Sequence, residues 1–102
     1  MEKLVRLAKI FSDINRLRIL GLILRDKEPC VCEICDTLKL SQPLVSRHLK
    51  SMKEEEILSS KQQGKWIIYS LSNDLNPHLE YWINEVQKHI SALPKLIACN
   101  TK

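Results

Sequence analysis

Glycine and proline are both scarce in this chain of 102 residues, which contains 2 and 4 of them. No apolar run approaches the roughly 18 residues that suggest a membrane-spanning helix. Because 44% of the residues are apolar, this composition favours a mostly helical globular protein over a disordered chain. The length fits one domain over residues 1–102 and leaves no room for a second. So small a domain buries a modest core, and dimerisation would add stability.

The chain also shows no secretion signal, and we expect a cytoplasmic protein without membrane association. In that compartment cysteines serve more often as ligands or redox groups than as structural disulfides. The net charge of +4 is uneven, since residues 39–71 carry six Lys and Arg against three Asp and Glu. A polyanion is expected to dock on this middle third, although a solvated basic surface gives the same pattern.

The spacing of apolar residues predicts helices until residue 56 and strands after it. Ser12-Asp13 and Ser41 are good N-caps, and Pro43 is tolerated in a first helical turn. Gly64 permits the positive φ of a polar hairpin tip over 62–65. The expected elements are helices over 3–11, from Ile14 to Leu24, over 31–38 and from Ser41 past Met52, strands over 57–60 and 66–71, and a last helix from Pro77 to Leu93.

Two helices joined by a tight turn and followed by a hairpin predict a mainly α fold with a β-hairpin wing, a winged helix-turn-helix. The second helix of that motif enters the major groove of DNA. A helical hairpin with solvated charges would look similar, but the basic wing tip favours DNA. The residues expected to contact DNA are Ser41, Gln42, Ser46, Arg47, Lys50, Lys61 and Lys65, with His48 at the edge of the exposed face.

Three cysteines, Cys30, Cys32 and Cys35, lie within six residues at the start of the short helix. A single cysteine is usually a small buried apolar residue, while Cys32 and Cys35 form a C-x-x-C pair typical of redox sites. The element order does not match a thioredoxin-like fold. The third interpretation is a site for a thiophilic ion.

The three cysteines do not lie on one face of an ideal helix. Cys32 and Cys35 share one helical face, but Cys30 is about 200° from Cys32 around the helix. All three sulfurs therefore meet one ion only if the first turn unwinds. Three thiolates suit trivalent arsenic, whereas structural zinc normally takes four ligands.

Four segments are distinctive, namely Asp13–Leu20, Cys30–Cys35, Leu40–Leu49 and Gly64–Tyr69. They resemble the ArsR/SmtB family of winged-helix metalloregulators, and its arsenic-responsive repressors in particular. They span nearly the whole chain, and the cysteine segment is the most discriminating. The resemblance implies a homodimer joined through the first and last helices, bound to double-stranded operator DNA and not an enzyme. It further implies release by arsenite or antimonite held by Cys30, Cys32 and Cys35, with no cofactor required.

Other members of this family bind zinc on the last helix, where this chain has Asn76, His78, His89 and Ala92. Asn76 and Ala92 do not suit zinc, so we expect His78 and His89 to be surface residues. Cadmium- and lead-type members add cysteines from an N-terminal arm, and here no cysteine precedes Cys30.

Two rival functions stay open from the sequence. One is a thiol redox sensor on the same fold, and the other is a small metal-binding or disulfide-exchanging protein with no DNA role. Cys99 is expected to be a bystander, and Trp66 and Tyr69 to pack the wing against the domain.

Overall fold

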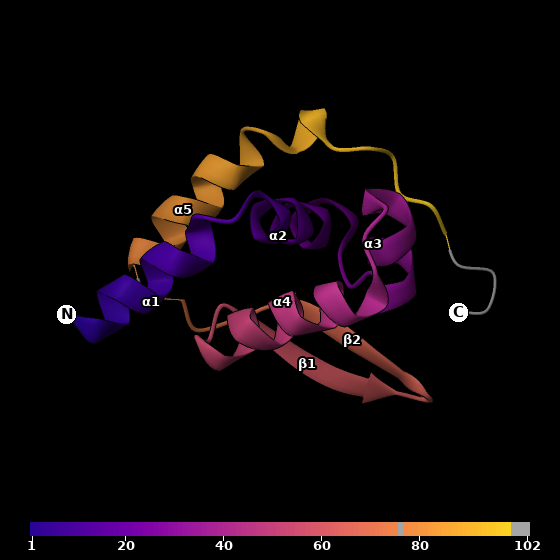
Figure 1. The fold of residues 1–102 in the computed structure, drawn as a ribbon, viewed down its shortest axis with the longest axis horizontal. Helices are drawn as coiled ribbons and strands as arrows, with labels where there is room; N and C mark the ends of the chain where they lie inside the picture. The colour runs from indigo at the N-terminus through magenta and orange to yellow at the C-terminus, as the bar shows by residue number, and fades with distance from the viewer. Residues whose placement is uncertain (76, 99–102) are drawn as a thin grey trace.

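The computed structural model describes residues 1–75 and 77–98. Figure 1 shows α2 at the centre, with α1 and α5 at one end, α3 at the other, and the hairpin beside α4. Within the described residues, none of the helices has the length and apolar character to cross a lipid bilayer. The elements in chain order are α1 (Glu2–Phe11), α2 (Ile14–Asp26), α3 (Val31–Leu38), α4 (Gln42–Glu54), β1 (Leu58–Gln63), β2 (Trp66–Leu71), α5 (Pro77–Gln87) and a 3₁₀ helix, η1 (Ile90–Ala92).

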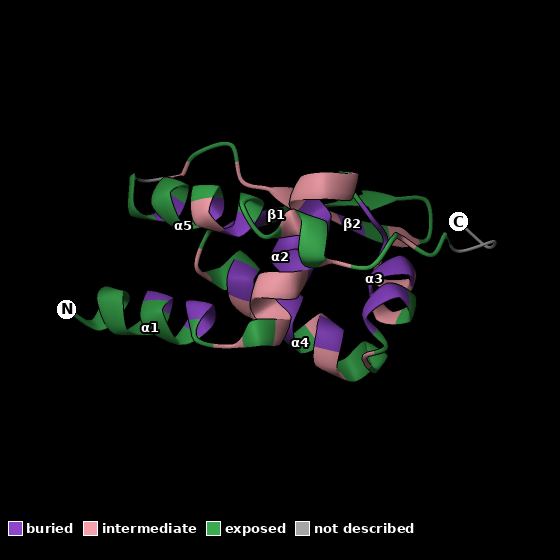
Figure 2. Ribbon diagram, turned by 90° about the horizontal axis from the view of Figure 1, so that it is seen from above, coloured by how far each residue is buried: buried purple, intermediate pink, exposed green. Residues whose placement is uncertain are grey.

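The core is built around α2, which contacts every other helix and strand β2. Ile19, Leu20 and Leu22 on α2 are all 0% exposed. Burial of each such side chain stabilises the fold by about 1.5–3 kcal/mol. Figure 2 shows buried residues concentrated toward this centre and exposed ones along α1 and α5.

Local capping explains where the helices begin, as the sequence predicts. The Asp13 carboxylate accepts hydrogen bonds from the backbone N–H groups of Asn15, at 2.8 Å, and Arg16, at 3.3 Å. The Ser41 hydroxyl accepts one from the N–H of Leu44 at 3.4 Å. Between α3 and α4, Lys39 takes a left-handed conformation with φ 58°. These contacts position α3 and α4 as the two helices of a helix-turn-helix.

The hairpin is tighter than the predicted one. Gln63 pairs directly with Trp66, so Gly64 and Lys65 alone form the turn, and Gln62 and Gln63 belong to β1. Gly64 has φ +63° at the first central position, where a type II′ hairpin turn requires a positive φ. The prediction of a longer polar tip was wrong because two-residue turns suit the twist of paired strands.

The last helix is shorter than predicted, ending at Gln87 instead of Leu93. The N–H of His89 bonds to the carbonyl of Val86, three residues back, at 2.9 Å. Leu93 turns inward over Gly21, where a Cβ atom would lie 2.6 Å from the Leu93 Cδ1. Pro94 then prevents continuation of the helix.

The segment after η1 crosses α2 and α3. The Arg25 guanidinium donates to the carbonyls of Leu93 and Pro94, at 3.2 and 2.7 Å. The N–H of Ile97 donates to the Thr37 hydroxyl at 2.8 Å. The C-terminal segment therefore contacts the helix that carries the cysteines.

Candidate DNA-binding surface and thiol site

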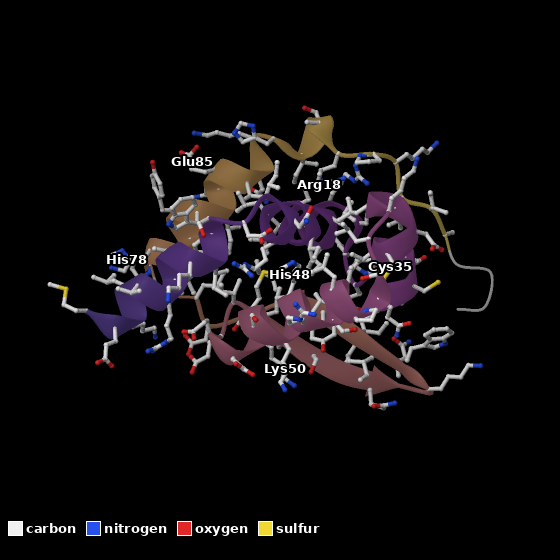
Figure 3. All side chains as sticks on the ribbon, in the orientation of Figure 1. Arg18, Cys35, His48, Lys50, His78 and Glu85 are labelled. Atoms are coloured by element: carbon white, nitrogen blue, oxygen red, sulfur yellow. The ribbon has the colours of Figure 1, made fainter. Side chains whose placement is uncertain are left out.

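Helix α4 has one buried and one exposed face. Val45, Leu49 and Met52 are each 0% exposed and join the core. The exposed residues of its other face include three predicted DNA contacts, Gln42, Arg47 and Lys50, while Ser46 is half-buried. In Figure 3, Lys50 extends away from the body of the molecule. This face presents amide, guanidinium and ammonium donors, the groups that read bases and phosphates.

His48 is placed differently from the sequence prediction. Its side chain is 6% exposed and lies between α4 and the centre of the molecule (Figure 3), instead of at the edge of the exposed face. The Arg16 Nη1 is 3.1 Å from the His48 Nδ1. Because a guanidinium only donates hydrogen bonds, Nδ1 is the acceptor and His48 is neutral with its proton on Nε2.

Arg16 is a positioning residue that the sequence reading missed. Its guanidinium also donates to the carbonyls of Lys9, at 2.8 Å, and Ile10, at 2.9 Å. It thereby joins the end of α1 to the middle of α4. Burial lowers the pKa of His48, and the charges of Arg16 and Arg47 lower it further against the opposing charge of Asp13.

The two wing lysines have different surroundings. The Lys61 ammonium lies 3.0 Å from the Glu28 carboxylate in the loop between α2 and α3. The Lys65 ammonium lies at the turn, 5.6 Å from the centre of the Trp66 ring. Tyr69 packs against the hydrophobic core, as predicted. Lys65 is therefore the wing cation that is available at the tip, whereas Lys61 is held beside the α2–α3 loop.

Cys30 is the most enclosed of the three predicted ligands, at 0% exposure. It is the N-cap residue of α3, and its N–H donates to the Glu33 carboxylate at 3.0 Å. Its main chain also forms an isolated antiparallel bridge with Ile68 of β2. The cysteine box, residues 30–35, is thus linked by its first residue to the wing.

Cys32 and Cys35 are half-buried, and all three cysteines are thiols. The Cys32 Sγ donates to the Asp36 carboxylate at 3.7 Å. Burial raises the pKa of the Cys35 thiol, and Asp36 and Cys30 raise it further. In the described residues no three His, Cys, Asp or Glu side chains form a group that could hold a metal ion. The convergence of the thiols by unwinding of the first turn therefore stays a prediction.

The remaining candidate ligands do not form a second centre with the thiols. His78 and His89 are exposed, as expected of surface residues. Cys99 and Asn76 lie outside the described residues.

A cavity of about 310 Å³ lies between α3, α4 and the wing. Cys32 lines it together with Gln42 and Ser46 of α4 and with Lys65 and Tyr69 of the hairpin. One predicted thiol ligand therefore shares a wall with predicted DNA contacts from both elements.

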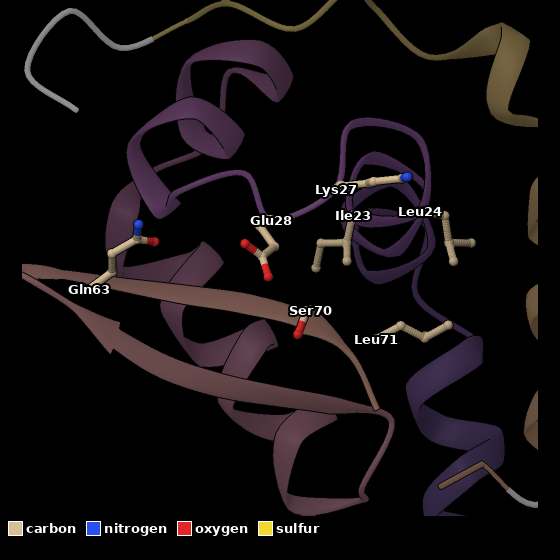
Figure 4. Close-up of a pocket in the computed structure, with 7 residues that line it drawn as sticks. All are labelled: Ile23, Leu24, Lys27, Glu28, Gln63, Ser70 and Leu71. Atoms are coloured by element: carbon tan, nitrogen blue, oxygen red, sulfur yellow. The ribbon is translucent and has the colours of Figure 1, made fainter. Parts of the chain in front are cut away.

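A larger cavity of about 670 Å³ lies between the end of α2 and the hairpin, with Glu28 and Ser70 on its two sides (Figure 4). Lys27 and Glu28 in its lining have positive φ angles of 49° and 30°. Such conformations are strained for residues with a Cβ and cost of order 1–3 kcal/mol each. The strained segment directly precedes Pro29 and Cys30.

Comparison with known proteins identifies the family. The family model described as "Bacterial regulatory protein, arsR family" matches residues 13–60, from the N-cap of α2 into β1. The chain is also 40% identical to the "Arsenical resistance operon repressor" of Escherichia coli K12 over 82 residues, which are 80% of this chain and 67% of that protein. The chain belongs to the ArsR family. It is a DNA-binding transcriptional regulator and not an enzyme.

Solved structures of other transcriptional regulators share its fold. The transcriptional repressor PagR of Bacillus anthracis superposes with a TM-score of 0.66 at 33% identity, covering 83% of this chain and 93% of that one. A homodimeric winged helix-turn-helix domain from Mycobacterium bovis, Mb0332, superposes with a TM-score of 0.69 at 20% identity, covering 88% and 80%. The predicted winged helix-turn-helix fold is confirmed.

Proposed function

We propose that the protein is a homodimeric repressor of operator DNA, acting in the cytoplasm, that arsenite or antimonite releases. The observation that carries the proposal is the position of the thiols. Cys30, Cys32 and Cys35 lie at the start of α3, which packs directly against α4. The name of the Escherichia coli relative supports the class of inducer. The metalloid acts as an effector, and no resident cofactor is needed.

Each protomer would insert α4 into the major groove, with Arg47 and Gln42 facing base edges and Lys50 facing phosphate. Lys65 at the wing tip would contact the backbone outside that groove. Lys61 could exchange Glu28 for a phosphate, because an exposed ion pair of this kind stabilises by only about 0–1 kcal/mol. Two protomers would read an inverted repeat with half-sites about one DNA turn apart, or a multiple of it.

A second copy would cover apolar side chains that α1, α2 and α5 expose. Leu79 and Val86 of α5 are 2% and 8% exposed and belong to the core of the chain itself, so a second copy would not contact them. Other side chains remain available for the second copy, and Trp82 among them stacks on Phe11 with ring centroids 4.7 Å apart. The exposed apolar residues are Leu4, 53%, Val5, 52%, Ile14, 71%, Tyr81, 63%, and Trp82, 40%.

Helices α1 and α5, which carry all of these residues except Ile14, lie at the end of the molecule away from α3 (Figure 1). Exposed apolar patches of this kind mark interaction sites. The Mycobacterium bovis neighbour of the same fold is homodimeric, and we place the proposed interface at this end because of the exposed apolar side chains there.

Inducer capture would be a condensation without change of oxidation state. Each thiol forms an S–As bond and transfers its proton to a hydroxyl of arsenous acid, which leaves as water. Three thiols displace three hydroxyls, so no net proton is released while the thiols are protonated. The attacking species is the thiolate, and the raised pKa of Cys35 slows this step near neutral pH without weakening the final complex.

Cys32 and Cys35 would bind first because they share a face of α3, and Cys30 would complete the site. To reach the ion, Cys30 must leave its buried position, which disturbs its bond to Glu33 and its bridge to Ile68. Strain released at Lys27 and Glu28 would offset part of this cost. A coupling of about 1–3 kcal/mol between inducer and DNA is typical of such switches.

The deciding experiment measures operator affinity at fixed salt with and without arsenite. We expect the wild-type protein to lose affinity with arsenite and a Cys30→Ser, Cys32→Ser, Cys35→Ser triple variant to show no change on arsenite addition. Cys99→Ser is the matched control and should respond like the wild type. Release of the triple variant by arsenite would refute the thiol site. Release of the wild type by mild oxidation alone, without any arsenite response, would identify a redox sensor instead.

A further inference from the structure

The cavity of about 310 Å³ between α3, α4 and the wing has a lining suited to an anion. Lys65 contributes an ammonium, and Gln42, Ser46 and Tyr69 contribute an amide and two hydroxyl groups. No Asp or Glu is among the described residues that line it. By contrast, the cavity in Figure 4 has Glu28 as well as Lys27 in its lining. Another cavity has three carboxylates and one ammonium in its lining, from Glu55, Glu56, Asp74 and Lys3.

The position of the cavity indicates which anion it would bind, if α4 and the wing contact DNA as proposed above. A phosphate backbone separates neighbouring grooves of a duplex. When α4 lies in the major groove and the hairpin contacts DNA beside it, that backbone must pass between α4 and the hairpin. Gln42 is also the first residue of the thirteen-residue helix α4, and the partial positive charge of a helix N-terminus favours phosphate.

The same cavity is lined by Cys32 from α3. Cys35, one turn further along α3, packs against the hydrophobic core and is not among the residues of this lining. The two thiols of the C-x-x-C pair therefore differ in their neighbours, since Cys32 borders the cavity between the DNA-contacting elements and Cys35 packs against the edge of the core.

We propose that this cavity binds a backbone phosphate of operator DNA, and that any group attached to the Cys32 sulfur occupies the same space. DNA and a Cys32 ligand then exclude each other sterically. This exclusion adds to the unwinding of α3, and it needs only one thiol, whereas unwinding needs all three. The inference rests on the proposed DNA binding but not on arsenite as the inducer.

Two single-cysteine proteins separate this exclusion from unwinding, since one thiol cannot form a three-thiolate site. One keeps Cys32 (Cys30→Ser, Cys35→Ser, Cys99→Ser), and its matched control keeps Cys35 (Cys30→Ser, Cys32→Ser, Cys99→Ser). Each is alkylated with N-ethylmaleimide with and without operator duplex, and the rate is followed by mass spectrometry. Fluorescence anisotropy in the same mixtures reports DNA binding.

At an operator concentration ten times Kd, each protein is free about a tenth of the time, so full exclusion slows alkylation about tenfold. We expect about that protection at Cys32 and less than about twofold at Cys35. A scrambled duplex of equal length, at a salt concentration where it does not bind, should protect neither thiol.

Three outcomes would overturn the inference. Operator binding without protection of Cys32 refutes it and leaves the proposed repressor function standing. Equal protection of both thiols refutes it as well, because general stabilisation of α3 then explains the result. Absence of operator binding in these proteins and in the wild type refutes both the inference and the proposed function.

Discussion

The two helices of the helix-turn-helix begin in different ways. Helix α4 starts at Ser41, whose hydroxyl caps it, and Pro43 lies in its first turn. The N-cap of helix α3 is Cys30, whose N–H donates a hydrogen bond to the Glu33 carboxylate. Shortly before it in the chain, Lys27 and Glu28 have strained positive φ angles. Helix α3 also has only 8 residues against the 13 of α4, and helices that short are marginal without tertiary contacts. If the protein acts as proposed, α4 is the more rigid helix that binds DNA, and α3 is the more deformable helix that binds the inducer.

We expect the largest effect from substitutions of the α3 cysteines, measured as the change in operator affinity on arsenite addition. Cys32→Ser or Cys35→Ser should abolish the change in operator affinity on arsenite addition, because the primary pair of ligands is lost. Cys30→Ser should keep part of the response, since two thiolates still hold the ion. Titration of each variant with arsenite in an anisotropy assay measures this. A full response in Cys35→Ser would contradict the assignment of the primary pair.

On the rigid helix, Arg47→Ala should weaken specific operator binding by about 1–3 kcal/mol if Arg47 contacts a base. Arsenite binding, followed by tryptophan fluorescence or calorimetry, should not change. Lys65→Ala is the matched comparison. It should weaken binding to all sequences similarly and lower the salt dependence by about one unit of slope. Unchanged operator affinity in both variants would refute the proposed docking face.

The capping of α3 offers a smaller and more selective test. Glu33→Ala removes the acceptor for the Cys30 N–H and should lower the free energy of unfolding by about 1 kcal/mol. Because part of the unwinding is then already accomplished, half-release should need up to about fivefold less arsenite. Glu33→Gln keeps an acceptor oxygen and should stay closer to the wild type. Equal behaviour of the two variants would show that the cap does not control the switch.

The smallest effect concerns the contact that positions α4. Since burial lowers the pKa of His48 below 6.5, the folded state favours neutral His48. Its contribution to stability is complete above the unfolded pKa and is lost as the pH falls through the folded pKa. His48→Asn keeps an acceptor for Arg16 without titrating. Urea unfolding between pH 7.5 and about 5 should therefore show a steeper loss for the wild type than for His48→Asn, and parallel curves would contradict this.

Features set by neighbouring residues were predictable from the sequence. Asp13 and Ser41 cap the helices that they were expected to cap, and α3 has the predicted bounds. Each depends on contacts within one helical turn or on the position of a proline. The cysteine box was visible because its spacing is local.

Features that depend on distant partners were not predictable in the same way. The sequence predicts His48 at the edge of the exposed face of α4. In the structure it is buried and contacts Arg16, which lies 32 positions earlier in the chain. Ile14 has helical spacing with Leu17 but is 71% exposed, because it starts α2 at a surface that the rest of the chain does not cover. The end of α5 depends on Gly21, which lets Leu93 approach α2.

The bridge between Cys30 and Ile68 joins main chains, and its geometry is largely indifferent to which side chain stands at position 30. Substituting Cys30 by serine therefore removes one of the three proposed thiol ligands and leaves the main-chain connection to the wing in place. Any other reactive side chain introduced at this position would inherit that connection. In the proposed mechanism, the main-chain bridge would connect the ligand site to the wing, and the side chain at position 30 would decide which ligand is bound there.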